Sequence, residues 1–191
     1  MIADDGSGTG SPAGSRTVDR IDVAVVTPDA FVRVIGKGSY KLCPALKAFG
    51  LVALDQGCRR LVIDMASCIG MDSTFMGVVA GLTLRTNEQQ GELVMVCLSD
   101  KNRLLLETLG LADLIRAETG RSAGGCPGGL RPLEPAVDRT DTTTTMLQAH
   151  ETLVGVAPGN EARFRDVLGY LEGGTLYLKG QNRTLGPAPG R

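Results

Sequence analysis

Asp72, Ser73 and Thr74 form the stretch of this chain whose residue types and order could carry chemistry. A carboxylate followed by two hydroxyls can cap a helix, present a nucleophile or accept a phosphate. The apolar run Leu61–Ile63 before them is typical of a strand that is covered on both faces. The three polar residues therefore lie where a buried strand is expected to pass into a helix.

A catalytic serine needs a base, usually a histidine, that removes the proton from its hydroxyl. The chain has one histidine, His150, which falls at helical spacing with Met146 and Leu153 near the C-terminus. The residues around Ser73 also lack the Gly-x-Ser-x-Gly spacing of a nucleophile elbow. We therefore predict no catalytic residue and no enzyme activity, and we expect His150 to be a half-buried helix side chain.

The first turn of a helix favours a phosphate, because its backbone N–H groups are unpaired and lie at the positive end of the helix dipole. A phosphate on Ser73 would add about −1.5 to −2 charge next to Asp72 and would eject a protein docked there. The alternative is that Asp72 caps the helix and the two hydroxyls only fill its first turn. The residue types alone leave both interpretations open.

Other kinds of site find little support. Asp64 and Asp72 have no further ligand cluster near them, so we expect no metal and no cofactor. The five cysteines include no C-x-x-C pair and most lie in apolar runs, which favours reduced thiols in a cytoplasmic protein over a disulfide framework. A formal net charge of −1 offers no broad basic surface to nucleic acid, and no apolar run reaches the length that spans a membrane.

The elements expected to position these residues alternate along the chain. The β-branched runs Ile21–Val26 and Phe31–Ile35, separated by a turn that contains proline, predict a hairpin. Apolar spacing predicts helices, and buried-type runs predict strands, in the segments 42–53 (helix), 59–65 (strand ending near Asp64), 73–89 (helix), 92–98 (strand), 101–109 (helix) and around Leu114 and Ile115 (strand). This order predicts an α/β fold, a sheet layered by helices.

The rest of the chain divides by composition. We expect a disordered leader over residues 1–17, the folded domain over 18–118, a Gly/Pro-rich loop or linker over 119–141, a pair of amphipathic helices over 142–173 and a tail over 174–191. Asn160 is expected to cap the second of the two helices. Because such short helices cannot fold alone, they must pack on the domain, on each other across a dimer, or on a partner.

The stretch "LVIDMASCIGMDSTFMGVVAGL" resembles the STAS domain, the family of anti-sigma factor antagonists. The matching positions are Asp64 at the end of a strand, then the run Met71–Thr74, with Gly77 and Gly81 in the helix that follows. The later stretch "GELVMVCLSDKNRLLLETLGLADLI" is similar to the family's next strand, helix and closing Gly-Leu turn. The resemblance covers about residues 18–118.

This resemblance implies a mixed β-sheet with helices mainly on one face, here followed by two C-terminal helices. It also implies a non-enzymatic, bacterial signalling domain that binds an anti-sigma factor or a related serine kinase in a phosphorylation-controlled partner switch. Ser73 would be the phosphorylated residue, with Thr74 as the alternative, and the partner-binding residues would be Asp72, Ser73, Thr74, Phe75 and Met76. Family members usually carry Gly and an apolar residue where this chain has Phe75 and Met76, so the helix start offered to a kinase differs here.

Two other functions remain open at this point. The domain could be a scaffold that self-associates as a homodimer through its C-terminal helices, without phosphorylation. It could also sense a small ligand or nucleotide at the same helix start.

Overall fold

The computed structural model of the chain describes residues 18–118, 127–134 and 139–183. The predicted leader over 1–17, much of the predicted linker over 119–141 and the last part of the predicted tail, 184–191, lie outside the described residues.

The described strands form one mixed sheet with the order β5-β4-β3-β2-β1-β6. β1 pairs antiparallel with β2 and β6, whereas β2, β3, β4 and β5 pair in parallel. The strands are β1 (Arg20–Val26), β2 (Asp29–Gly38), β3 (Arg60–Met71), β4 (Glu92–Val96), β5 (Arg116–Glu118) and β6 (Arg131–Pro132). The predicted hairpin and the predicted α/β class are both confirmed.

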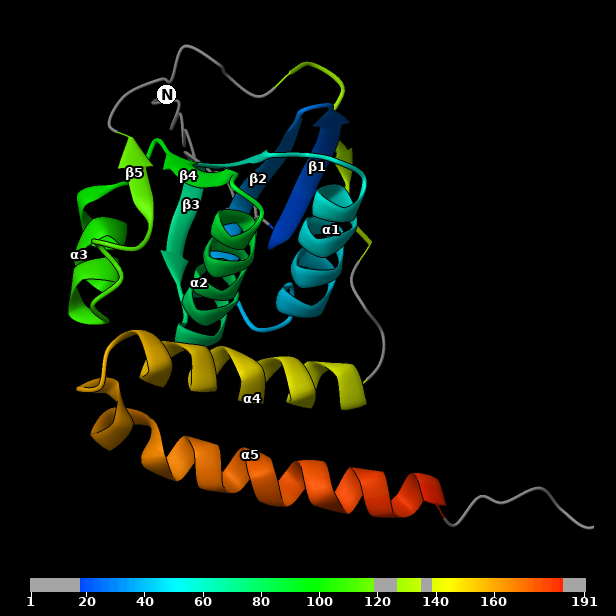
Figure 1. Cartoon of the computed structure of the whole chain (residues 1–191), viewed down its shortest axis with the longest axis vertical. Helices are drawn as coiled ribbons and strands as arrows, with labels where there is room; N and C mark the ends of the chain where they lie inside the picture. Colours follow the sequence, from blue (N-terminus) through cyan, green and yellow to red (C-terminus); the bar gives the residue numbers. More distant parts are fainter. Residues whose placement is uncertain (1–17, 119–126, 135–138, 184–191) are drawn as a thin grey trace, which may run out of the picture.

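Helices α1, α2 and α3 pack against one face of this sheet, as predicted (Figure 1). Helix α4 crosses below the ends of α1 and α2 in this view, and α5 lies beneath α4 (Figure 1). Pro44 lies in the first turn of α1, and Gly57, with a φ of 94°, follows its end. The bounds are α1 (Cys43–Asp55), α2 (Ser73–Glu88), α3 (Asp100–Thr108), α4 (Arg139–Val156) and α5 (Asn160–Arg183).

The main core lies between the sheet and these helices. Side chains of β2 and β3 alternate, so that Val32 and Ile63 face the helices while Phe31 and Val62 face the other way. Both sets are buried, and Phe31 and Val62 join Val94 and Val96 in a second, smaller cluster. β3 is therefore apolar on both faces, as its sequence predicted.

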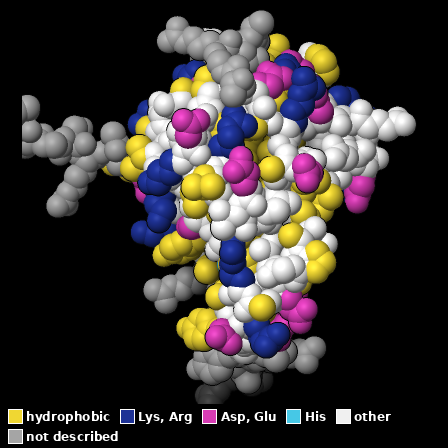
Figure 2. Space-filling view, turned by 90° about the vertical axis from the view of Figure 1, so that its left-hand side faces the viewer, with side chains coloured by type: hydrophobic (Ala, Val, Ile, Leu, Met, Phe, Trp, Pro, Cys, Tyr) yellow, Lys and Arg dark blue, Asp and Glu magenta, His cyan; other side chains and the backbone are white. Residues whose placement is uncertain are grey.

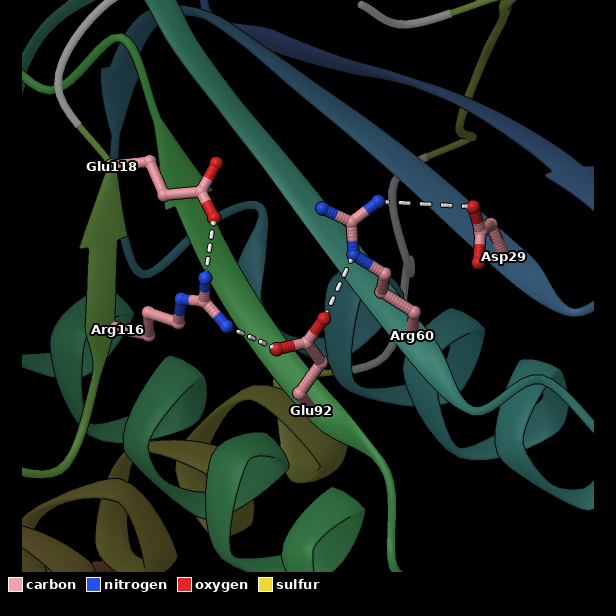
Figure 3. A network of polar contacts seen from close by, with 5 residues as sticks. All are labelled: Asp29, Arg60, Glu92, Arg116 and Glu118. Carbon is pink, nitrogen blue, oxygen red and sulfur yellow. Dashed lines mark hydrogen bonds and ion pairs between the residues drawn. The ribbon is translucent and has the colours of Figure 1, made fainter. Parts of the chain in front are cut away.

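Charged residues at one end of the central strands form a row of ion pairs (Figure 3). Arg60 of β3 pairs with Glu92 at 3.0 Å and with Asp29 at 3.9 Å. Arg116 of β5 pairs with Glu92 at 2.9 Å and with Glu118 at 3.1 Å. All five residues keep partial exposure, so each pair stabilises the fold only weakly, by about 0–1 kcal/mol.

The outer surface shows no large area of one charge on the face drawn in Figure 2. There Lys and Arg side chains lie interspersed with Asp and Glu, and the hydrophobic side chains stand in small separate groups (Figure 2). In the parts of the chain that the structure describes, no helix is both long and apolar enough to cross a membrane.

The predicted end of the third strand is wrong. β3 continues to Met71, because its second half pairs with the end of β2 from Ile35↔Ser67 to Gly38↔Met71 after a shift in register. Asp64 is consequently in mid-strand, where its carboxylate accepts a hydrogen bond from Arg33 Nε at 3.0 Å. The second half of β3 is held in the sheet by backbone pairing with β2, and a pattern of apolar side chains does not predict such pairing.

Several other bounds also differ from the predicted ones. β5 begins at Arg116, and Leu114 and Ile115 belong to the turn before it, since the buried Ile115 fills the core without pairing in the sheet. β6 and the start of α4 fall within the predicted linker, where a two-residue edge strand leaves no periodic signal. Helix α5 runs on to Arg183, past the predicted end at residue 173.

Candidate functional site at the start of α2

Asp72 fixes the start of α2. Its Oδ1 accepts a hydrogen bond from the backbone N–H of Phe75 at 2.9 Å, which is the bond of a helix cap. Its Oδ2 accepts from the backbone N–H of Tyr40 at 2.8 Å, and its own N–H donates to the Gly38 carbonyl at 3.0 Å. The predicted cap is confirmed, and the same carboxylate also ties the helix to the segment between β2 and α1.

The residues after Ser73 point into the domain. Thr74, Phe75 and Met76 are 3%, 0% and 4% exposed. Of the five predicted partner-binding residues, only Asp72 and Ser73 retain a moderate share of surface. The bulky Phe75 is accommodated by Gly38, because a Cβ at that position would lie 3.0 Å from the ring. The side chains of Thr74, Phe75 and Met76 are thus unavailable to a partner in this arrangement.

Ser73 contacts the one histidine of the chain. Ser73 Oγ lies 3.0 Å from His150 Nε2, although the two residues are 77 positions apart in the sequence. His150 Nδ1 lies 2.8 Å from the Met146 carbonyl, which can only accept, so Nδ1 carries the proton. In the neutral ring, Nε2 is then the acceptor and the Ser73 hydroxyl is the donor.

This contact between His150 and Ser73 was not predicted from the sequence. His150 is also more buried than predicted, at 3% exposure, and its ring meets the Phe164 ring edge to face at a centroid distance of 4.9 Å. A hydroxyl bonded to an imidazole is the geometry of a nucleophile and its base. Here, however, Nδ1 is bonded to a neutral carbonyl, so that no carboxylate stabilises an imidazolium at this nitrogen.

Two glycines of α2 allow α4 to cross close to this pair. A Cβ on Gly77 would lie 2.3 Å from the carbonyl oxygen of Ala149, so the backbones of α2 and α4 touch there. Gly81, one turn further, faces Thr152, and a Cβ there would meet its Oγ1 at 3.8 Å, an ordinary contact. Ser73, Gly77 and Gly81 recur every four residues and thus lie on one face of α2. That face is the one that α4 covers.

The turn between α4 and α5 is attached to the end of α3. Asn160 Nδ2 donates to the carbonyls of Leu109 at 3.0 Å and Leu153 at 2.9 Å, and Arg163 donates to the Thr108 carbonyl at 3.1 Å. Asn160 was predicted to cap α5, but its amide group is a buried donor that joins α3 to α4. A local sequence pattern cannot distinguish these two uses of an asparagine.

A cysteine lies close to Asp72 at the start of α2. Cys43, at the start of α1, is fully buried, and its thiol donates to the Ser39 carbonyl at 3.4 Å. Burial, and secondarily the negative charge of Asp72, raises the pKa of this thiol far above its ordinary range. Cys43 is therefore a structural thiol that stays protonated. Within the described residues, no group of three His, Cys, Asp or Glu side chains could hold a metal ion.

A comparison with known protein families matches the part of the chain that contains the start of α2. Residues 28–116, somewhat less than half of the chain, match the family described as "Mlab, STAS domain". The chain carries a STAS domain. The matched residues extend from the start of β2 to the start of β5 and contain the whole of α2, including Asp72 and Ser73. They end before α4 and α5.

The STAS domain also has named relatives. Anti-sigma-B factor antagonists of several Staphylococcus aureus strains are 28% identical over 102 residues, which cover 52% of this chain and 94% of the relative. A solved structure of the anti-sigma factor antagonist SpoIIAA in its unphosphorylated form is 19% identical, covers 54% of this chain and 91% of that one, and has a TM-score of 0.48. A putative anti-sigma factor antagonist from Thermotoga maritima is 13% identical, covers 52% and 86%, and also has a TM-score of 0.48.

The Staphylococcus aureus relatives are only slightly longer than the region that matches this chain. The match takes up 94% of the length of the Staphylococcus aureus proteins, so only a few of their residues lie outside it. Helices α4 and α5 lie outside the residues that match the family.

Proposed function

We propose that this STAS domain is a non-enzymatic signalling module of the bacterial cytoplasm that binds an anti-sigma factor or a related serine kinase, with Ser73 as its phosphorylation switch. The observation that carries the proposal is the position of Ser73 as the first residue of α2, directly after the capping Asp72. Of the two neighbouring residues with a hydroxyl, Ser73 is partly exposed, whereas Thr74 is buried. This contrast favours Ser73 over Thr74 as the modified residue.

The proposed docking surface is centred on Asp72 and Ser73. Thr74, Phe75 and Met76 would support it from inside, since they seat the helix start on the sheet. A phosphate on Ser73 would add a charge of about −1.5 to −2, of the same sign as that of Asp72, to this small surface. The unphosphorylated form would hold the partner, and the phosphorylated form would release it through repulsion and desolvation. The name of the relatives, anti-sigma-B factor antagonist, supports this class of partner.

The test combines the full chain with the anti-sigma serine kinases encoded in the same genome and with ATP. We expect mass spectrometry to find one phosphate on Ser73, none in S73A, and wild-type modification in T74V, which keeps the shape of the buried side chain. We expect S73D to bind the kinase about tenfold or more weakly than wild type, as a like charge does at a docked surface. An S73D variant that binds with wild-type affinity would refute the switch. So would a Ser73 that stays unmodified both in wild type and in H150A, in which the contact with Ser73 is removed.

Self-association is a second candidate, favoured by one observation. Tyr170 is 81% exposed on α5, and Val167, one turn before it, is 37% exposed, so α5 has apolar side chains on its outer side. A homodimer through this side would cover both. Light scattering of the full chain would then give twice the mass of the monomer, and Y170D would give the monomer mass; a monomeric wild type excludes this candidate.

A further inference from the structure

Helix α4 occupies the face of α2 that begins at Ser73. We propose that α4 and α5 are an intramolecular competitor of the partner: α4 covers the α2 surface around Ser73 and Gly77, His150 holds the Ser73 hydroxyl, and a partner kinase gains access only when α4 leaves. This inference rests on the proposed function and adds its regulation.

The first support is the state of the Ser73 hydroxyl. A kinase transfers a phosphoryl group to an oxygen that is free to attack and that can give up its proton to the enzyme's own base. Here the hydroxyl donates its hydrogen bond to His150, and the imidazole is nearly without exposure under Phe164 of α5. While α4 is in place, the acceptor oxygen is therefore engaged and screened.

The second support is the fit between the two helices. Gly77 lets the backbone of α4 approach so closely that no side chain could stand between them. Small residues at every fourth position make a groove that accepts a helix. Helix α4 fills this groove with Ala149 at the closest point, and Ala149 and Leu153 are buried there. A partner helix that docks at Ser73 would have to replace it.

The third support is that the contact between α4 and the domain is incompletely filled, although Ala149, Leu153 and Phe164 pack into the main hydrophobic core. Helix α5 packs on α4 and lies on the far side of it from the sheet (Figure 1). Between α1, α2 and α4 there is a half-open cavity of about 300 Å³, lined by residues that include Lys47, Leu51 and Gln148. Since a void forfeits contacts along its lining, this part of the interface between α4 and the domain is incompletely packed.

The glycines offer a matched pair of variants for the packing. G77A places a Cβ against the Ala149 backbone, whereas G81A places one at ordinary contact distance from Thr152. Both changes replace glycine by alanine within α2, so both raise helix propensity equally. We expect hydrogen exchange of the α4 amides to become about tenfold or more faster in G77A, with β3 and β4 unchanged, and to stay as in wild type in G81A. Equal exchange in the two variants would overturn the proposal.

The competition itself is tested by a reversible lock. The double variant G81C/T152C places two cysteines in facing turns of α2 and α4, where a Cβ at position 81 lies 3.8 Å from Thr152 Oγ1, and is designed to form a disulfide between them. We expect the oxidised protein to resist phosphorylation of Ser73 by the anti-sigma serine kinase and ATP, and the reduced protein to accept it. In T152C alone, neither oxidation nor reduction should change the rate of Ser73 phosphorylation. H150A, which frees the hydroxyl, should be phosphorylated about fivefold or more faster than wild type.

The outcomes separate the two proposals. If the oxidised lock is phosphorylated as fast as the reduced form, or if H150A is no faster than wild type, α4 is not a competitor, while the proposed switch at Ser73 stands. If Ser73 stays unmodified in wild type, in H150A and in the reduced double variant alike, the proposed function fails and this inference fails with it.

Discussion

The ring of Phe75 lies flat against Gly38, and two of its atoms would stand 3.0 Å from a Cβ at position 38. Phe75 is in the first turn of α2, and Gly38 is the last residue of β2, whose carbonyl accepts the N–H of Asp72. The contact therefore sets how close the start of the helix lies to the sheet. A change on either side would move Asp72 and Ser73.

Replacement of Gly38 by alanine should destabilise the protein by about 1–3 kcal/mol, because the fully buried ring has no free space to move into. Urea unfolding measures this loss. G70A is the matched control, since a Cβ there would meet only the end of the Lys101 side chain at 3.8 Å. In G38A/F75L the smaller side chain should recover part of the loss, and strictly additive losses would show that the two residues are not coupled.

Asp72 should matter through both of its carboxylate oxygens. D72A removes the acceptors of the Phe75 and Tyr40 N–H groups and should cost about 1–3 kcal/mol of unfolding free energy. D72N keeps one acceptor oxygen but turns an N–H₂ group toward the other donor, so its loss should fall between those of wild type and D72A. Urea unfolding of the three proteins should give this order. A D72N protein as stable as wild type would mean that only the helix cap contributes.

The sequence pattern predicted the elements around the site better than it predicted their surfaces. Within the predicted helix over 73–89, Phe75, Val79 and Leu82 recur at a spacing that forms one helical stripe, and all three residues are buried. That same stripe argued against Phe75 as a docking residue, because a side chain on the inner face of a helix cannot also meet a partner. The partner-binding role of Phe75 came from the family resemblance, whereas the apolar spacing indicated the inner face on which the side chain lies.

The contact between Ser73 and His150 could not be predicted, because periodicity describes one helix at a time and says nothing about residues 77 positions apart. One indirect signal was present. His150 shares a helical stripe with Leu153, which is fully buried, and a buried imidazole requires hydrogen-bond partners. The sequence could therefore have indicated that His150 has a polar partner on the domain, although not which one.

Cys43 should make stability fall in alkaline solution. Because the pKa of its thiol is raised in the folded state, the folded protein keeps a proton that the unfolded chain loses above the ordinary thiol pKa of 9.0. The contribution is complete below that pH and decreases by about 1.4 kcal/mol for each pH unit above it. Unfolding free energies at about pH 8 and about pH 10 should differ more in wild type than in C43A. Equal differences in the two proteins would contradict the raised pKa, since all other titrating groups are common to both.

Asn160 should hold the turn between α4 and α5 on the domain through its amide N–H₂ group. N160D has the same shape but turns a carboxylate oxygen toward the Leu109 and Leu153 carbonyls, so two donated bonds become a contact between acceptors. The change should cost about 1–3 kcal/mol and should speed hydrogen exchange in α4 and at the start of α5, with β3 and β4 little affected. The double variant N160D/E161Q restores the net charge at an exposed neighbouring position and should exchange as fast as N160D. If it instead exchanged as slowly as wild type, the added charge rather than the lost hydrogen bonds would explain the effect.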